Sequence, residues 1–173
     1  GRGGVIEQAA YIDSVRLADG RNNVLLMHAG DFGQGTSYFT EMNGNIEVDV
    51  LNAMEFDVVC LGNHEFDNGI EELARRIGNL DAPVVCANYD FTGSALDGLV
   101  KPYVIFEKAG RKIGVIGLLT DVTSVVDRNI AAQMRYRNPA ETANEFAYML
   151  KVEQRCDLVI CLTHLGYEGE IYT

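Results

Sequence analysis

Long apolar runs and positive charge are both scarce in this sequence of 173 residues. No stretch approaches the roughly 20 apolar residues that a helix needs to cross a bilayer, so no membrane span is predicted. Lys and Arg number 14 against 25 Asp and Glu, which gives a formal net charge of −11. Nucleic acid and anionic membranes bind to basic surfaces, so neither is expected as the main partner. A small anionic substrate is compatible with this charge, because a bound metal ion can reverse the local field.

Closely spaced cysteine pairs are also absent, since none of the four cysteines belongs to a Cys-x-x-Cys pair. Cys60, Cys86 and Cys161 lie inside apolar, strand-like runs, and Cys156 lies just before another. We expect them to be small buried side chains and not a disulfide framework. The cysteines therefore do not determine the cellular compartment.

Strand-like and helix-like segments alternate along the chain. Helices are predicted over residues 4–18, 37–54, 69–78 and 139–155, and strands over 23–29, 56–61, 82–87 and 157–162. Residues 103–108 and 112–118 predict a hairpin that turns at Ala109-Gly110, and residues 88–100 predict a loop. This order indicates a single α/β domain with a largely parallel sheet that is covered on both faces.

Three of the predicted strands are followed at once by polar side chains. The run LLMHAGD ends at Asp31, VVCLG is followed by Asn63 and His64, and VICLT is followed by His164. The carboxyl ends of parallel strands lie along one rim of a sheet, so these side chains should lie close together. Carboxylate oxygen, amide oxygen and imidazole nitrogen all bind divalent metals. The pattern therefore predicts a metal or catalytic site.

Each of these residues also has a structural interpretation when it is taken alone. Asp31 could cap a helix or a turn, Asn63 could be a turn residue, and His164 could be a hydrogen-bonded structural histidine. His28 lies within its strand, so we expect a structural role for it. Glu65 is expected to support a metal ligand or to lie on the surface. Three strands that each end in such a residue favour a metal or catalytic site over three unrelated structural roles.

The segments GDFGQGT, GNHEFDNG and THLG, in this order after strands, resemble the calcineurin-like metallophosphoesterases. The segment GNHEFD is similar to the branch that contains 5′-nucleotidases and hydrolases of cyclic nucleotides and UDP-sugars. GGVIEQAAYID, ANYDF and KPYVIFEKAGRKIGVIGLLT extend the resemblance over nearly the whole chain. The implied fold is an α/β/β/α sandwich of mixed, largely parallel sheets. The implied activity is metal-dependent hydrolysis of phosphoric esters.

The resemblance also assigns roles to individual residues. Asp31 would bridge two divalent ions, which could be Mn, Zn, Mg or Fe, and Asn63 and His164 would bind the second ion. His64 would contact the phosphate together with Asn63 and help the leaving oxygen to depart, while Asp67 would hold the His64 ring. Two such ions neutralise the phosphate and generate a hydroxide for in-line attack.

The family pattern begins with an Asp-x-His strand upstream of Gly1 and ends with a Gly-His-x-His segment downstream of Thr173. The resemblance therefore implies that residues 1–173 are a single, incomplete catalytic domain, truncated at both ends. We expect this chain alone to bind metal weakly and to hydrolyse little. The substrate would be a small phosphorylated molecule, by resemblance a nucleotide. The sequence does not determine the oligomeric state.

The cellular location is also expected only by resemblance, which implies export to the periplasm or the cell surface. The chain has neither an initiator Met nor a signal peptide. We expect that a leader was removed or lies outside this sequence.

Two other functions are open. A relative that has kept the fold but lost its metals could act as a non-catalytic interaction or scaffold protein. Five retained residues argue against this: Asp31, Asn63, His64, Asp67 and His164. A nucleotide-binding α/β domain of another kind would need a P-loop or a Gly-x-Gly-x-x-Gly loop after a strand. The segment Gly33-Gln-Gly35-Thr36 fits neither loop well.

Overall fold

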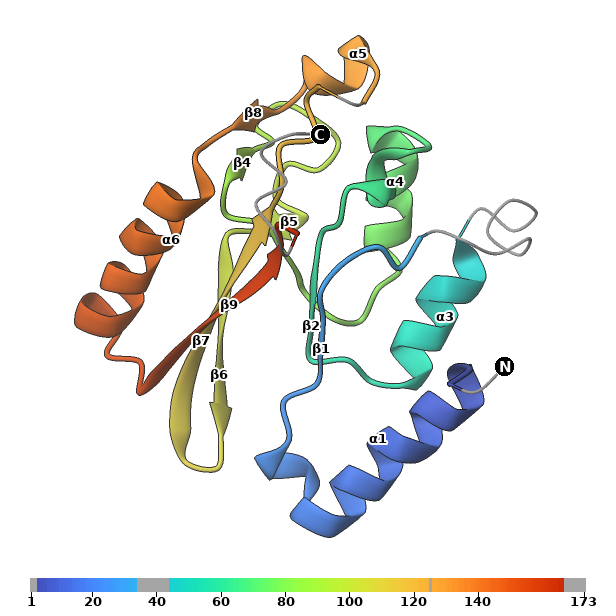
Figure 1. The fold of residues 1–173 in the computed structure, drawn as a ribbon, viewed down its shortest axis with the longest axis vertical. Helices are drawn as coiled ribbons and strands as arrows, with labels where there is room; N and C mark the ends of the chain where they lie inside the picture. The colour runs from blue at the N-terminus through green and yellow to red at the C-terminus, as the bar shows by residue number, and fades with distance from the viewer. Residues whose placement is uncertain (1–2, 34–43, 125, 167–173) are drawn as a thin grey trace.

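Two sheets face each other and carry helices on their outer sides (Figure 1). The computed structural model describes residues 3–33, 44–124 and 126–166. The first sheet is parallel and has the order β1 (Met27–His28), β2 (Val58–Cys60), β3 (Val84–Val85) and β5 (Val100–Lys101). The second sheet contains β6 (Tyr103–Lys108), β7 (Arg111–Leu119) and β9 (Leu158–His164), with β7 antiparallel to β6 and parallel to β9. A separate antiparallel pair joins β4 (Tyr89–Asp90) to β8 (Arg135–Tyr136).

The helices complete the sandwich. Their bounds are α1 (Val5–Asp19), α3 (Asn45–Ala53), α4 (Ile70–Ile77), α5 (Arg128–Ala131) and α6 (Pro139–Tyr148), and α6 continues as a π-helical turn, η3 (Met149–Glu153). Short 3-10 turns occur at η1 (Arg21–Asn23) and η2 (His64–Phe66). Figure 1 shows α3 and α4 beside the first sheet and α6 beside the second. The predicted α/β/β/α sandwich of mixed, largely parallel sheets is therefore confirmed.

Local sequence signals account for the best-defined elements. The Asn138 side chain accepts the backbone N–H groups of Ala140 and Glu141 at the start of α6, and Pro139 occupies the first turn. Ala109 and Gly110 both have positive φ, as a two-residue hairpin between β6 and β7 requires. The predicted hairpin is present, and the helix predicted over 139–155 begins at Pro139 as expected.

Several predicted boundaries were wrong. The strand predicted over 23–29 is limited to Met27–His28, and the strand over 82–87 is limited to Val84–Val85. The region 88–100, predicted as a loop, contains β4. The helix predicted over 37–54 is described only from Asn45 onward, because residues 34–43 lie outside the described residues.

The two sheets are held together by an apolar layer. Its buried members are Val58, Cys60, Val85, Val115 and Leu162. The sheets approach so closely at β7 that a Cβ atom on Gly117 would overlap the carbonyl group of Val85. The first sheet thus supplies one wall of the core and the second sheet the other.

One cysteine differs from the expectation of burial. Cys60, Cys86 and Cys156 are buried, but Cys161 is exposed. Successive side chains of a strand point to opposite faces, and Leu162 points into the layer between the sheets. Cys161 therefore points to the outer face of β9, which the described residues do not fully cover.

Candidate functional site

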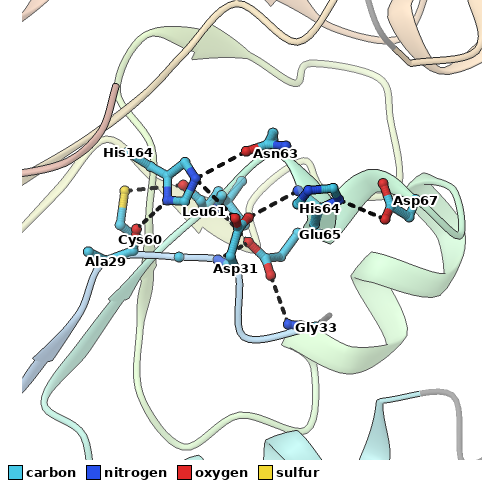
Figure 2. Close-up of polar contacts among 12 residues, drawn as sticks. Ala29, Asp31, Gly33, Cys60, Leu61, Asn63, His64, Glu65, Asp67 and His164 are labelled. Carbon is cyan, nitrogen blue, oxygen red and sulfur yellow. Dashed lines mark hydrogen bonds and ion pairs between the residues drawn. The ribbon is translucent and has the colours of Figure 1, made fainter. Parts of the chain in front are cut away.

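The site forms where loops from both sheets meet, as Figure 2 shows. Asp31 follows β1, and Asn63 and His64 follow β2, so these residues come from the first sheet. His164 is the last residue of β9 in the second sheet. The predicted convergence occurs, but the expectation of one rim on one sheet was wrong. The site lies across the facing ends of two sheets.

Two glycines allow the loops after β1 and β2 to touch. A Cβ atom on Gly30 would lie 2.5 Å from the Gly62 backbone nitrogen, and a Cβ atom on Gly62 would overlap Asp31. Asp31 itself adopts a left-handed conformation with a φ of 57°. Non-glycine residues adopt this conformation rarely, and strained backbone that the surrounding structure holds in place clusters at functional sites. The backbone is therefore arranged to bring Asp31 beside the turn that carries Asn63 and His64.

Glu65 holds the loop after β1 and the turn after β2 together. Its buried carboxylate accepts the backbone N–H groups of Asp31 at 2.8 Å, Gly62 at 2.5 Å and Gly33 at 3.1 Å. Burial is the main influence on the carboxyl group and raises the pKa of Glu65, while the three N–H donors oppose this rise. Arg76 donates to the Glu65 carbonyl oxygen at 2.7 Å. Of the two expected roles, the contacts support the first: Glu65 is not on the surface but joins the two loops.

His164 has a defined tautomer. Its Nδ1 lies 2.8 Å from the carbonyl oxygen of Ala29, and a carbonyl only accepts, so Nδ1 carries the proton. In the neutral ring, Nε2 then presents a lone pair. This atom lies 3.1 Å from Asn63 Oδ1 and 3.3 Å from Asp31 Oδ2. Three acceptor atoms therefore face one another.

Such a group of acceptors suits a bound cation. Ligand atoms at right angles and about 2.1 Å from an ion lie about 3 Å apart, which is the spacing found here. A backbone-bonded Nδ1 is also the usual support of a histidine that binds metal through Nε2. Within the described residues, no group of three or more His, Cys, Asp or Glu side chains could hold a metal. The acceptor group contains two residues of these types, Asp31 and His164, and its third possible ligand is the amide oxygen of Asn63.

His64 and Asp67 form a second polar unit beside this set. The His64 Nδ1 lies 2.9 Å from Asp67 Oδ2, so the ring donates from Nδ1 to the carboxylate. This hydrogen bond is the main reason that the pKa of His64 is raised. Both residues line a cavity of about 480 Å³. The His64 backbone N–H also donates to Asp31 Oδ1 at 3.1 Å, which links the two units.

His28 stands apart from the acceptor group. Its Nδ1 accepts the backbone N–H of Gly30 at 3.2 Å, and its ring packs edge-on against Phe32 and Phe56. Burial lowers the pKa of His28. These contacts agree with the expected structural role, which supports the turn before Asp31.

Several residues that line the cavity beside His64 were not predicted from the sequence. Thr120, Asp121 and Val122 follow β7, and Val126, Asp127 and Ile130 belong to the segment around α5. The strand end GLLTD resembles the other three strand ends, where an apolar run also ends in polar residues. That signal was present in the sequence and could have indicated these residues.

A family model described as calcineurin-like phosphoesterase matches residues 4–173. The chain belongs to the calcineurin-like phosphoesterase family. Members of this family use divalent metal ions. The acceptor group of Asp31, Asn63 and His164 is consistent with that property.

Similar proteins carry names of nucleotide hydrolases. The chain is 36% identical over 162 residues to the probable 5′-nucleotidase of Treponema pallidum, with 92% of this chain and 27% of that protein covered. It is 39% identical over 150 residues to the NAD 5′-nucleotidase of Haemophilus influenzae, with 86% and 25% covered. Among solved structures, the 5′-nucleotidase precursor of Thermus thermophilus has a TM-score of 0.87 at 32% identity, and the match covers 97% of this chain and 32% of that one.

The matched relatives are much longer than this chain, which spans between a quarter and a third of their length. Within the described residues, no helix combines the length and the apolar character needed to cross a membrane.

Proposed function

We propose that this chain is part of the catalytic domain of a metal-dependent phosphoester hydrolase that acts on nucleoside 5′-monophosphates. The observation that carries the proposal is the acceptor group of His164 Nε2, Asn63 Oδ1 and Asp31 Oδ2 beside the His64–Asp67 pair. The names of the similar proteins support a nucleotide as substrate. An exported location belongs to the same proposal and rests on resemblance alone.

Asp31, Asn63 and His164 would hold one divalent ion, and Asp31 would be shared with a second. Bound divalent ions of this kind neutralise phosphate oxygens and lower the pKa of a coordinated water. Among the described residues, the second ion would have Asp31 as its ligand and would need further ligands. This is why we expect the 173 residues alone to bind metal weakly.

His64 has the contacts of a group that protonates a leaving oxygen. The carboxylate of Asp67 orients the ring and raises the pKa of His64, so more of the imidazole carries a proton near neutral pH. Nε2 then donates to the substrate. Asn63 lies next to His64 in the chain and would contact the same phosphate. A scaffold protein would have no need of this pairing, which favours the catalytic hypothesis.

The test is phosphatase activity of the complete natural protein with p-nitrophenyl phosphate and AMP. Activity should require Mn²⁺ or Zn²⁺, disappear with chelator and return when the metal is restored. It should fall in His64→Asn and stay normal in Asn22→Ala, which changes a residue of η1 outside the site. Full activity in chelator would refute the two-metal mechanism. Absence of both activity and bound metal would support the scaffold alternative.

A further inference from the structure

Among the described residues, the end of β7 has a strand neighbour on one side only. β6 pairs with β7 as far as Tyr103 opposite Ile116, whereas β9 continues along the other side of β7 to His164, opposite Leu119. His164 is the residue of β9 that belongs to the acceptor group. The position of His164 therefore depends on a strand end that lies beyond the pairing with β6.

The segment 87–89 occupies the side of β7 that β6 leaves open. The Ala87 backbone N–H donates to the Gly117 carbonyl oxygen at 2.8 Å. The buried Asn88 side chain accepts the Leu119 backbone N–H at 2.9 Å and donates to the Leu119 carbonyl oxygen at 2.7 Å. One side-chain amide thus makes both hydrogen bonds that a neighbouring strand would make to this residue.

The Tyr89 hydroxyl continues this contact beyond the end of β7. It donates to the Thr120 carbonyl oxygen at 2.8 Å and accepts the Val122 backbone N–H at 2.8 Å. The ring that carries the hydroxyl is buried, stacks on Phe91 at a centroid distance of 5.8 Å and packs against Tyr136 of β8. The hydroxyl is therefore held in place by the packing of its own ring.

The Thr120 backbone connects this support to the acceptor group. Its N–H donates to the His164 carbonyl oxygen at 2.9 Å, and its carbonyl oxygen accepts the Tyr89 hydroxyl. The other two atoms of the acceptor group come from the loops of the first sheet. A shift of Thr120 would therefore move His164 relative to those two atoms.

We propose that Tyr89, together with Asn88, is a positioning residue for His164. This inference rests on the proposed function and adds to it two residues that contact neither metal nor substrate. They hold the end of β7 beside β9, so that His164 Nε2 faces Asn63 Oδ1 and Asp31 Oδ2. The segment ANYDF, which contributed only to the family resemblance, then has a physical role in the site.

The test uses Tyr89→Phe, which removes the hydroxyl and keeps the ring. We would measure Mn²⁺ affinity by equilibrium dialysis in the complete natural protein and in the variant, and urea unfolding would confirm that both are folded. The matched control is Asp157→Asn, because Asp157 joins the same two strands at their opposite ends through the Lys112 N–H. Both variants should be less stable than the natural protein.

Tyr89→Phe should weaken Mn²⁺ binding roughly threefold to tenfold, because groups that hold a metal ligand directly contribute about tenfold or more and Tyr89 acts through Thr120. Asp157→Asn should keep the natural affinity. Unchanged affinity in Tyr89→Phe, or an equal loss in both variants, would overturn the inference while leaving the proposed function intact. A natural protein that binds no Mn²⁺ would overturn the proposed function and the inference with it.

A double variant distinguishes the positioning of His164 from a general loosening of the site. If Tyr89 acts through His164, adding Tyr89→Phe to His164→Asn should weaken Mn²⁺ binding little beyond the loss that His164→Asn causes alone. Two losses that multiply would show that Tyr89 affects the site independently of His164, and the inference would then be wrong.

Discussion

The backbone N–H of Asp31 donates to Glu65 Oε2 at 2.8 Å, although the two residues lie 34 positions apart in the chain. The same oxygen accepts the N–H of Gly62, and Oε1 accepts that of Gly33. One carboxylate thus joins the loop after β1 to the turn after β2. The left-handed conformation of Asp31 is held in place by this contact.

We expect Glu65→Gln to lower the free energy of unfolding by about 1–3 kcal/mol, because the Gln side chain has one acceptor and must leave a buried N–H unpaired. Metal affinity should fall as well, since Asp31 loses its support. Urea unfolding and calorimetric titration with Mn²⁺ measure the two effects. Glu107→Gln, at an exposed position of β6, is the control. Equal stability of Glu65→Gln and the natural protein would contradict the joining role.

Removing the imidazole of His64 should affect substrates unequally. His64→Asn should lower kcat for AMP roughly a hundredfold, the lower end of the usual effect of proton transfer. The loss should be much smaller for p-nitrophenyl phosphate, because p-nitrophenolate departs without a proton. Asp67→Asn should act in the same direction but less strongly, since the ring remains. Steady-state kinetics with both substrates measures this, and an equal loss for both would exclude His64 as the proton donor.

The two site histidines should differ in their effect on metal binding. His164→Asn should weaken Mn²⁺ binding roughly tenfold or more, because even groups that only support metal ligands contribute this much. His64→Asn should leave affinity nearly unchanged, since the acceptor group consists of His164 Nε2, Asn63 Oδ1 and Asp31 Oδ2 and does not include the His64 ring. Equilibrium dialysis of the complete natural protein compares the two variants directly. A stronger effect of His64→Asn would reverse the assignment of the two residues.

The fold was predictable where short-range signals decide it. Asn138-Pro139 indicated the start of α6, and Ala109-Gly110 indicated the hairpin, because both act through their own neighbours. The pair β4–β8 could not be predicted, because Tyr89 and Tyr136 meet only when distant segments fold together. The predicted strands were too long where parallel pairing covers only two residues.

The convergence of Asp31, Asn63 and His164 was predictable, but the architecture that produces it was not. Apolar runs ending in Asp31, Asn63 and His164 gave the convergence. That His164 comes from the second sheet depends on how two sheets pack, which the order of elements does not reveal. The burial of Glu65 depends on three backbone donors from two loops, and no sequence pattern encodes it. The assigned catalytic and metal-binding roles remain predictions.

Asp157 provides a pH-dependent test of the sandwich outside the site. Its carboxylate accepts the Lys112 backbone N–H at 2.8 Å, which joins the starts of β7 and β9, and Arg111 lies 3.4 Å away. The Lys112 N–H is the largest cause that lowers the pKa of Asp157 below its ordinary value of 3.8. The folded-state pKa is therefore below the unfolded-state pKa. Asp157 stabilises the fold above the unfolded-state value, and this stabilisation is lost as pH falls through the folded-state value.

Asp157→Asn should therefore be less stable than the natural protein at neutral pH, and the difference should be smaller at an acidic pH below 3.8, since falling pH protonates the natural carboxylate there. Urea unfolding at both pH values measures the difference, with Asp19→Asn on the exposed face of α1 as the control. The control should show little difference at either pH. A difference for Asp157→Asn that is the same at both pH values would mean that the shape of the Asp157 side chain, and not its charge, holds the two strands together.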